Sequence, residues 1–481
     1  MNKSYSKELI SGAKWGSISQ VFNQASVFIG SIYLMRHLTP EDFGVVSIIT
    51  FFTGLLMIFS SVGLSASFVN KTTINNDDKD TLFWTSFTLG FTFGIVAFFS
   101  SHYWGLFFEN EEIEPAMQLI TIVFFLSPII AVPAAILKRK LAFKELAMVS
   151  IVSTLISFAT AIVLAIQGFG LYSLIWQRIV YTALNSILLF HTASYTPTFI
   201  FKKEIALQHL KFGIPLLGSK LINYAIGNAD NLLIGKFLGT ATLGFYSRAY
   251  AIVTIPTSRI SIIFGNVLFP VLSKMKNEKN RLKEIVLQLN SLTFFILFFL
   301  PLIFIATSDS FVRIISIKSE WDPIIPLIQI LAFVAFFKSI VALYSNIIIS
   351  KGDVRLSFNI ELLGGIIIVL GFILGVQFKI EYFTIIYLVS MLLFTSLYIR
   401  FLLKRIHISF KEYFHSIKIK AFIFIALLPI SFFFIKLNLL NEYLKFSLAT
   451  ITIGILWIAL NYVFDKDNTL FLFKTLKRVI V

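Results

Sequence analysis

The sequence has no cysteine and little charge. The lack of cysteine excludes disulfide bonds, cysteine-zinc sites and thiol catalysis. Only 14% of the residues are charged, against about 25% in ordinary soluble proteins. No polar stretch is long enough for a separate globular domain, and the alternating pattern of a membrane β-barrel is missing. The N-terminal arm also lacks the apolar core and cleavage site of a signal peptide, so we expect it to lead into the first helix.

The sequence is rich in long hydrophobic segments. Hydrophobic residues make up 57% of the chain and gather in many runs of about 20 residues, the length that crosses a ~30 Å hydrocarbon core as an α-helix. The sequence therefore predicts an all-α polytopic membrane protein. We expect 14 transmembrane helices, over residues 12–35, 44–68, 82–104, 117–137, 147–167, 171–190, 211–237, 242–270, 285–307, 323–349, 354–377, 380–403, 418–436 and 445–464.

The distribution of basic residues predicts the orientation. With the N-terminus in the cytoplasm, 29 of the 41 Lys and Arg residues fall on the cytoplasmic side, 7 fall outside and 5 lie within spans. Such an excess of basic residues in inner loops is the rule for membrane proteins. The loop with four acids and no base, residues 109–114, falls outside. We therefore expect a multi-pass protein of the bacterial cytoplasmic (inner) membrane with both termini in the cytoplasm.

The net charge of +16 follows from this topology. Basic inner loops face anionic lipid headgroups, so membrane lipids are the expected partners of this charge. No basic and aromatic surface domain is present to bind nucleic acid, and we predict no nucleic-acid partner.

An internal repeat relates two parts of the chain at an offset of 200 residues. Ser19 matches Ser219, Asn23 matches Asn223, and the match continues through Arg36/Lys236, Leu38/Leu238, Gly44/Gly244 and Ser47/Ser247. The second copy starts six helices after the first, so both start from the same side and form parallel repeats about an axis along the membrane normal. We expect two six-helix lobes, residues 1–200 and 201–405, and two additional transmembrane helices with a cytoplasmic tail in residues 406–481.

Several motifs resemble a known family. These are RHLTPEDFG at residues 36–44, NADNLLIGKFLG at 228–239, LGFY at 243–246, VLFPVLS at 267–273 and WDP at 321–323. In order and spacing they are similar to the polysaccharide (oligosaccharidyl-lipid) flippases of the multidrug/oligosaccharidyl-lipid/polysaccharide exporter superfamily. The similar branch exports colanic-acid-type and teichuronic-acid-type repeat units. The resemblance covers roughly residues 1–405.

The resemblance implies a transporter without a cofactor. Such proteins are expected to turn over undecaprenyl-diphosphate-linked oligosaccharides by alternating access, for surface polysaccharide such as O-antigen, capsule or exopolysaccharide. The expected partners are the lipid-linked anionic oligosaccharide and, in the same pathway, a polysaccharide polymerase and glycosyltransferases. No catalytic residue and no metal ligand is predicted.

Charged residues inside the predicted spans are the candidate site residues, because each costs at least ~2.5–3.5 kcal/mol to insert. Cations outnumber anions among them, and a surplus of cations fits an anionic cargo such as a diphosphate. The candidates for a cationic cavity that binds substrate are Arg259, Lys220, Arg248, Arg178 and Lys338, and those for ion coupling or ion pairing are Asp230 and Glu361.

Helical geometry groups four of these residues around a hairpin turn at Gly239. Asp230 and Arg248 lie nine residues on either side of it, so the pattern predicts that they pair at one depth. Lys220 and Arg259 lie nineteen and twenty residues away, and are level with each other. Other interpretations stay open: Arg178, Lys220 and Lys338 can snorkel to an interface, the Asp230–Arg248 pair can be purely structural, and Glu361 can be an interfacial acid.

Three other classes of protein are alternatives to a flippase. A polytopic glycan-synthesis enzyme is expected to carry a large external loop or a catalytic acidic pair, but the longest external segment, residues 307–323, has fewer than 20 residues. A small-molecule antiporter of the same superfamily, for an organic anion or a drug, is the closer alternative. The surplus of cationic residues argues against an organic cation as the substrate, but not against an organic anion. A purely structural membrane scaffold is the third alternative.

The predicted topology is testable by thiol labelling, because the native chain has no cysteine. In intact cells, Asn110→Cys is expected to react with a membrane-impermeant thiol reagent, whereas Asn277→Cys is expected to react only after permeabilisation. The opposite labelling pattern would overturn both the orientation and the number of spans.

Overall fold

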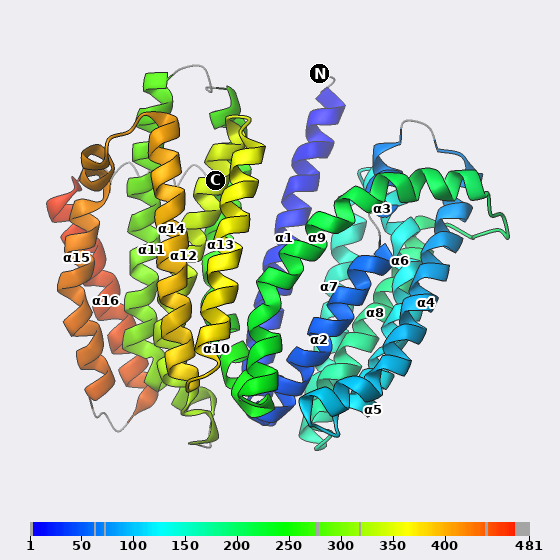
Figure 1. Cartoon of the computed structure of the whole chain (residues 1–481), viewed down its shortest axis with the longest axis horizontal. Coiled ribbons are helices and arrows are strands. Elements are labelled where there is room, and N and C mark those ends of the chain that lie inside the picture. The colour runs from blue at the N-terminus through cyan, green and yellow to red at the C-terminus, as the bar shows by residue number, and fades with distance from the viewer. Residues whose placement is uncertain are drawn as a thin grey trace. The chain divides into compact units, whose positions relative to one another are not determined.

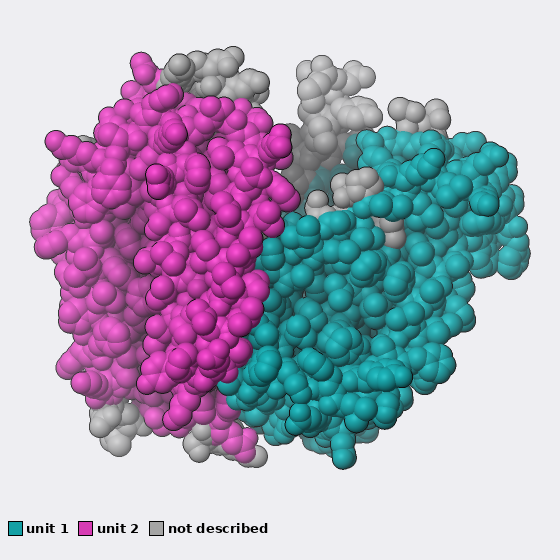
Figure 2. Space-filling model, in the orientation of Figure 1, with its two compact units in different colours: residues 1–244 teal, residues 245–481 magenta. Residues whose placement is uncertain are grey.

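The computed structural model describes residues 3–61, 64–71, 74–274, 279–316, 319–437 and 441–466. Within these ranges it does not describe the side chains of residues 3–10, 13, 61, 65, 66, 215, 216, 219, 258–274, 279 and 319. The chain divides into two compact units, residues 1–244 and residues 245–481 (Figure 2). The described residues form helices and connecting turns, without a strand.

Unit 1 is a bundle whose helices pack in the order α1, α7, α8, α6, α4, α2 and α9 (Figure 1). Its core is formed by apolar side chains that include Leu82, Val132 and Leu189, each at most 3% exposed. The helices are α1 (Lys3–Leu34), α2 (Pro40–Ser61), α3 (Leu64–Asn70), α4 (Asn76–Phe108), α5 (Ile113–Ile120), α6 (Ile122–Arg139), α7 (Phe143–Ile166), α8 (Leu171–Ala193), α9 (Lys203–Phe237) and the start of α10 (Thr240–Lys274).

Unit 2 is built around α11, which packs against α12, α15 and α16. Its core includes Leu302, Ile423 and Trp457, all fully or almost fully buried. Besides the rest of α10, the helices are α11 (Lys279–Ile315), the 3-10 turn η1 (Ser319–Trp321), α12 (Ile324–Ser350), α13 (Val354–Gly375), α14 (Ile380–Ile406), α15 (Phe410–Lys436) and α16 (Glu442–Phe464).

The prediction of an all-α polytopic bundle is confirmed, and each of the 14 predicted spans falls on a helix or a pair of helices. In the described part of the chain, 10 helices are long and apolar enough to cross a membrane. The other predicted spans are α1, α8, α9 and α10, which carry more polar side chains. The span predicted at 44–68 overlaps α2 and α3, and residues 62 and 63 between them lie outside the described residues. The span at 117–137 is divided into α5 and α6 at Thr121, whose hydroxyl donates to the Gln118 carbonyl.

The turns of unit 1 gather at two ends of the bundle that differ in charge. At the end where α2 and α10 begin, Asn110 donates to Glu41, and Lys236 pairs with Glu109 at 2.9 Å. This hydrogen-bonded ion pair lowers the pKa of Glu109, whereas burial, with Asp42 and Glu41 nearby, raises the pKa of Glu112. The acidic loop therefore lies at the end that we predict to face outward.

Basic residues dominate the opposite end. Arg139 donates to backbone carbonyls at the C-terminus of α3, and Lys71 pairs with buried Asp78 at 2.6 Å. Lys202 pairs with Asp77, and this hydrogen-bonded carboxylate raises the pKa of Lys202. The charges of unit 1 are thus segregated as the positive-inside rule requires, although which end faces the cytoplasm stays a prediction.

Two glycines join the repeated hairpins in a reciprocal contact. Helix α2 begins at Pro40 and α10 at Thr240, positions that are 200 residues apart, as in the sequence repeat. A Cβ atom on Gly44 would lie 1.8 Å from the Thr240 carbonyl oxygen, and one on Gly244 would lie 1.7 Å from the Pro40 carbonyl oxygen. The glycine of each repeat thus contacts the residue that begins the second helix of the other repeat. This is the contact expected across a two-fold axis, and it supports the parallel repeat.

We predict that Gly44→Ala destabilises the protein, because the new methyl group must push apart two helix backbones. Overpacking of this kind typically costs about 1–3 kcal/mol. Gly227→Ala is the matched control, since a Cβ atom there meets nothing within 4 Å. Thermal unfolding in detergent is expected to show a lower midpoint for Gly44→Ala and no loss for Gly227→Ala. Equal midpoints would show that the crossing tolerates a side chain.

Candidate functional site

Close packing of α2 and α9 positions the candidate site. Gly54 leaves room for the ring of Tyr224: a Cβ atom at Gly54 would lie 2.2 Å from the tyrosine oxygen. The Tyr224 hydroxyl lies 2.9 Å from the Phe51 carbonyl and 3.2 Å from the Thr50 carbonyl, to which it can donate. Lys220 precedes Tyr224 by one turn of α9. The packing of Tyr224 therefore fixes the place of Lys220 beside the second half of α2.

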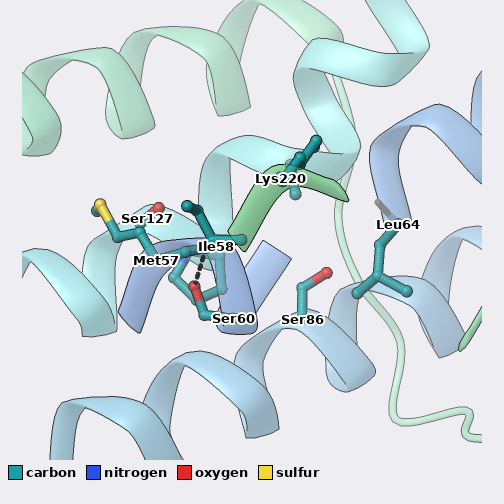
Figure 3. A pocket seen from close by; sticks show the side chains of 9 residues that line it. Met57, Ile58, Ser60, Leu64, Ser86, Ser127 and Lys220 are labelled. Atoms are coloured by element: carbon teal, nitrogen blue, oxygen red, sulfur yellow. Dashed lines mark hydrogen bonds between the residues drawn. The ribbon is translucent and has the colours of Figure 1, made fainter. Parts of the chain in front are cut away.

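Lys220 lines a cavity of about 360 Å³ inside unit 1. Figure 3 shows Lys220 of α9 on one side of this cavity, with residues of α2, α3, α4 and α6 around it. We call this space the Lys220 pocket. It is lined by Met57, Ile58, Ser60, Leu64, Ser86, Ser127, Pro128, Ala131 and Lys220.

The pocket lies well inside the bundle. Ser86 lies ten residues after the start of α4, or ~15 Å along the helix, and Ser127 lies twelve residues before the end of α6, or ~18 Å. These distances place the pocket inside the bundle, more than two helical turns from the end at which α4 begins and α6 ends. A charged side chain at this depth is costly in lipid, so its exposed ammonium group requires an aqueous or polar cavity.

The polar groups of the pocket can bind an anion. Lys220 forms no ion pair with any side chain in the part of the chain that the structure describes. Ser86 is 4% exposed, and its hydroxyl has no hydrogen-bond partner among the described residues. The Ser60 hydroxyl donates to the Met57 carbonyl at 3.0 Å. An ammonium group and an unsatisfied buried hydroxyl together offer positive charge and a hydrogen-bond donor to a ligand oxygen.

The other predicted cations lie in several places. Arg178 is an exposed residue of α8, seven residues from its start. In unit 2, Lys338 lies over the Tyr250 ring at 5.2 Å and donates to the Tyr250 hydroxyl. The side chain of Arg259, the residue predicted to share the level of Lys220, lies outside the described residues.

The predicted pair of Asp230 and Arg248 is divided between the units. Asp230 is 5% exposed in unit 1, and its carboxylate accepts from the Asn231 backbone amide at 2.9 Å. Arg248 belongs to α10 in unit 2. Their pairing therefore stays a prediction.

Glu361 lies in a cluster of hydroxyl groups between α12, α13 and α14. Its carboxylate accepts from Ser345 at 2.8 Å and from Tyr398 at 3.2 Å. Ser357 completes the cluster, 3.0 Å from the Ser345 hydroxyl, and both serines are buried. Among the described residues, no Lys or Arg pairs with Glu361. The hydrogen-bond donors to this carboxylate are therefore neutral hydroxyl groups.

Sequence reasoning missed two buried lysines in the last two helices. Lys420 is 3% exposed, donates to Ser291 at 2.6 Å and pairs with Asp465. Lys445, equally buried, pairs with Asp309 at 2.6 Å. The predicted topology places both at the ends of spans, and neither is among the candidate site residues. The sequence does contain the two acids, Asp465 and Asp309, each near an end of a predicted helix. Their pairing with these lysines could not be predicted before the packing of the helices was known.

No group of metal-binding side chains occurs in the residues that the structure describes. The buried polar residues are mostly Ser and Thr, with a few Asn, His, Lys and Asp side chains. The candidate site is therefore the Lys220 pocket, with Glu361 and Lys338 as separate polar positions in unit 2.

The chain is similar in sequence to proteins named for the biosynthesis of polysaccharides. The chain is 25% identical over 357 residues to the teichuronic acid biosynthesis protein TuaB of Bacillus subtilis, covering 74% of each chain. It is 24% identical over 373 residues to the lipopolysaccharide biosynthesis protein WzxC of Escherichia coli, covering 77% of this chain and 76% of that one. These relatives agree with the resemblance that the motifs indicated.

The fold is shared with solved transporter structures. The lipid II flippase MurJ in an inward closed conformation matches with a TM-score of 0.75 at 14% identity, covering 94% of this chain and 98% of that one. An inward-facing multidrug resistance MATE family transporter of the MOP superfamily matches with a TM-score of 0.61 at 14% identity, covering 80% and 94%. At this level of identity the likeness concerns the fold alone.

The family assignment rests on the sequence. Residues 33–326, well over half of the chain, match the family described as "Polysaccharide biosynthesis protein". This range includes the first hairpin motif, the second hairpin motif and the whole Lys220 pocket. The suspected resemblance is confirmed, and the chain belongs to the polysaccharide biosynthesis protein family.

Proposed function

We propose that this protein is a flippase that moves a lipid-linked anionic oligosaccharide across the bacterial cytoplasmic membrane for the synthesis of a surface polysaccharide. Its membership in the family supports this, as do relatives named for the synthesis of teichuronic acid and lipopolysaccharide and a fold shared with a lipid II flippase. The single observation in this chain that carries the proposal is the Lys220 pocket, a cavity inside unit 1 that is lined by a lysine ammonium group and serine hydroxyls.

The size of the pocket indicates which part of the substrate it takes. A volume of about 360 Å³ is at the lower end for sites that enclose a small molecule, and is too small for an oligosaccharide. It fits a compact anionic group such as the diphosphate that joins sugar to lipid. Lys220 supplies the charge and Ser86 a hydroxyl donor. Arg259, Arg248, Arg178 and Lys338 remain proposed contributors to a larger cationic cavity.

The proposed mechanism is alternating access without covalent chemistry. The reciprocal glycine contact supports two parallel lobes, and the lobes proposed from the repeat are residues 1–200 and 201–405, followed by the additional helices of 406–481. Both termini lie in the cytoplasm in this proposal. Asp230 and Glu361 are the proposed coupling or ion-pair residues. The partners are the lipid-linked substrate, a polymerase that uses the exported unit and the glycosyltransferases that build it.

Loss of the protein is expected to stop export while synthesis continues. A deletion strain should accumulate the complete lipid-linked repeat unit on the cytoplasmic leaflet and lose its surface polymer, which lipid extraction and polymer staining measure. A shortened or missing repeat unit would favour a glycan-synthesis enzyme instead. An unchanged polymer with altered resistance to toxic compounds would favour a small-molecule antiporter.

The pocket itself is tested by substitution of Lys220. Hydrogen bonds to charged groups are worth about 1.5–3 kcal/mol, so Lys220→Ala should lower export about 10- to 100-fold at normal membrane abundance. Lys220→Arg should retain much of the activity because it keeps the charge. The matched control is Lys211→Ala, which removes an exposed lysine of the same helix outside the pocket. Normal export by a well-expressed double variant Lys220→Ala, Arg259→Ala would refute the anion site without refuting transport.

A further inference from the structure

The loop between α8 and α9, residues 194–202, displays an apolar tip. Phe199 is 93% exposed, Phe201 is 57% exposed and Ile200 between them is 37% exposed. We call these three residues the apolar tip. Three consecutive apolar side chains at the surface of a loop are unfavourable in water, and they indicate a surface that something covers.

The loop is fixed to the first part of α4. The buried carboxylate of Asp80 accepts from the Tyr195 hydroxyl at 2.7 Å and also from the Thr198 hydroxyl. Farther along the loop, the backbone amide of Lys202 donates to the Thr81 hydroxyl at 3.1 Å. These bonds hold both ends of the apolar tip, so the tip cannot fold back into the core while they remain.

Trp84 joins the apolar tip to α4 directly. Its indole donates to the Thr198 carbonyl at 2.8 Å, and its ring stacks on Phe199 with the centroids 5.1 Å apart. Figure 1 shows the loop that leads into α9 beside this end of α4. The depth of Trp84 in the membrane is therefore also the depth of the tip.

The length of α4 gives that depth. Its 33 residues span ~50 Å, about 20 Å more than a hydrocarbon core of ~30 Å, so ~10 Å extends beyond the core at each end. Trp84 lies eight residues after the start at Asn76, or ~12 Å along the helix. It therefore lies at the boundary between headgroups and hydrocarbon, where tryptophan is enriched in membrane proteins.

We infer that the apolar tip inserts into the headgroup boundary of the lipid leaflet at this end of unit 1. Lys203, which follows the tip and is exposed, lies where it can reach lipid phosphates. The inference needs only that the chain crosses a membrane, so it is independent of the proposed substrate. Since the loop leads directly into α9, the inserted tip anchors the start of the helix that carries Lys220.

Spin labels can test the insertion, because the chain has no native cysteine. Phe199→Cys and Phe201→Cys are labelled in the purified full-length protein, which is reconstituted into vesicles of phosphatidylethanolamine and phosphatidylglycerol. Thr196→Cys, at an exposed position of the same loop before the tip, is the matched control. Collision with oxygen, which concentrates in lipid, is compared with collision with a water-soluble nickel chelate.

Both tip labels are expected to collide more with oxygen than with the nickel chelate, and the label at position 196 is expected to show the reverse. A higher collision rate with the chelate at both tip positions would place the tip in water and overturn the inference. Exclusion of both reagents would overturn it as well, because the tip would then be covered by protein. Two tip positions are used so that the outcome does not depend on the loss of the Phe199–Trp84 stack.

Discussion

The close approach of α2 and α9 is the constraint on which the candidate site depends. At one end Gly44 and Gly244 let the two repeated hairpins touch backbone to backbone, and along the helices Gly54 admits the Tyr224 ring. A larger side chain at these glycines would separate the helices. Lys220, one turn from Tyr224, would then move away from the serines of α2, α4 and α6, and the pocket would lose its charge. Close packing thus decides the electrostatics of the site.

The cost of charge in lipid explains why so few charged side chains occur within the spans and where they lie. Lys220 faces a cavity, Lys338 lies against a tyrosine, and Lys420 and Lys445 pair with carboxylates. Each solution removes the charge from hydrocarbon in a different way. The cavity leaves the charge of Lys220 available to a ligand, whereas carboxylates neutralise Lys420 and Lys445. The two buried ion pairs instead hold α15 and α16 to α11 or to each other, which suits a structural role for the additional helices.

Charged residues are also distributed unevenly between the two ends of unit 1. Acidic residues lie at one end, where Asn110 donates to Glu41, whereas lysines, Arg139 and the loop before α9 lie at the other. The aromatic residues of that loop lie at the depth of Trp84. The beginning of α9 is thus bound to the bundle, its middle carries Lys220, and its far end joins the glycine contact. One helix connects the membrane boundary, the pocket and the repeat.

Much of the fold could be predicted from the sequence because a membrane allows few choices. Apolar runs of about 20 residues must become helices, since backbone groups in lipid must satisfy their own hydrogen bonds. The repeat at an offset of 200 residues and the hairpin motifs likewise indicated two related hairpins and the family. The boundary between α5 and α6 was not predicted, because the break at Thr121 leaves no interruption in hydrophobicity.

The sequence alone determined the class of fold, the candidate charges and the family, because these depend on composition, period and local motifs. It could not determine which charges face a cavity. Lys220 and Lys420 look alike in sequence, each a lysine in an apolar helix, yet one lines a pocket and the other is buried against Asp465. That difference depends on which helix face meets which neighbour. Only the packing of side chains from distant parts of the chain sets it.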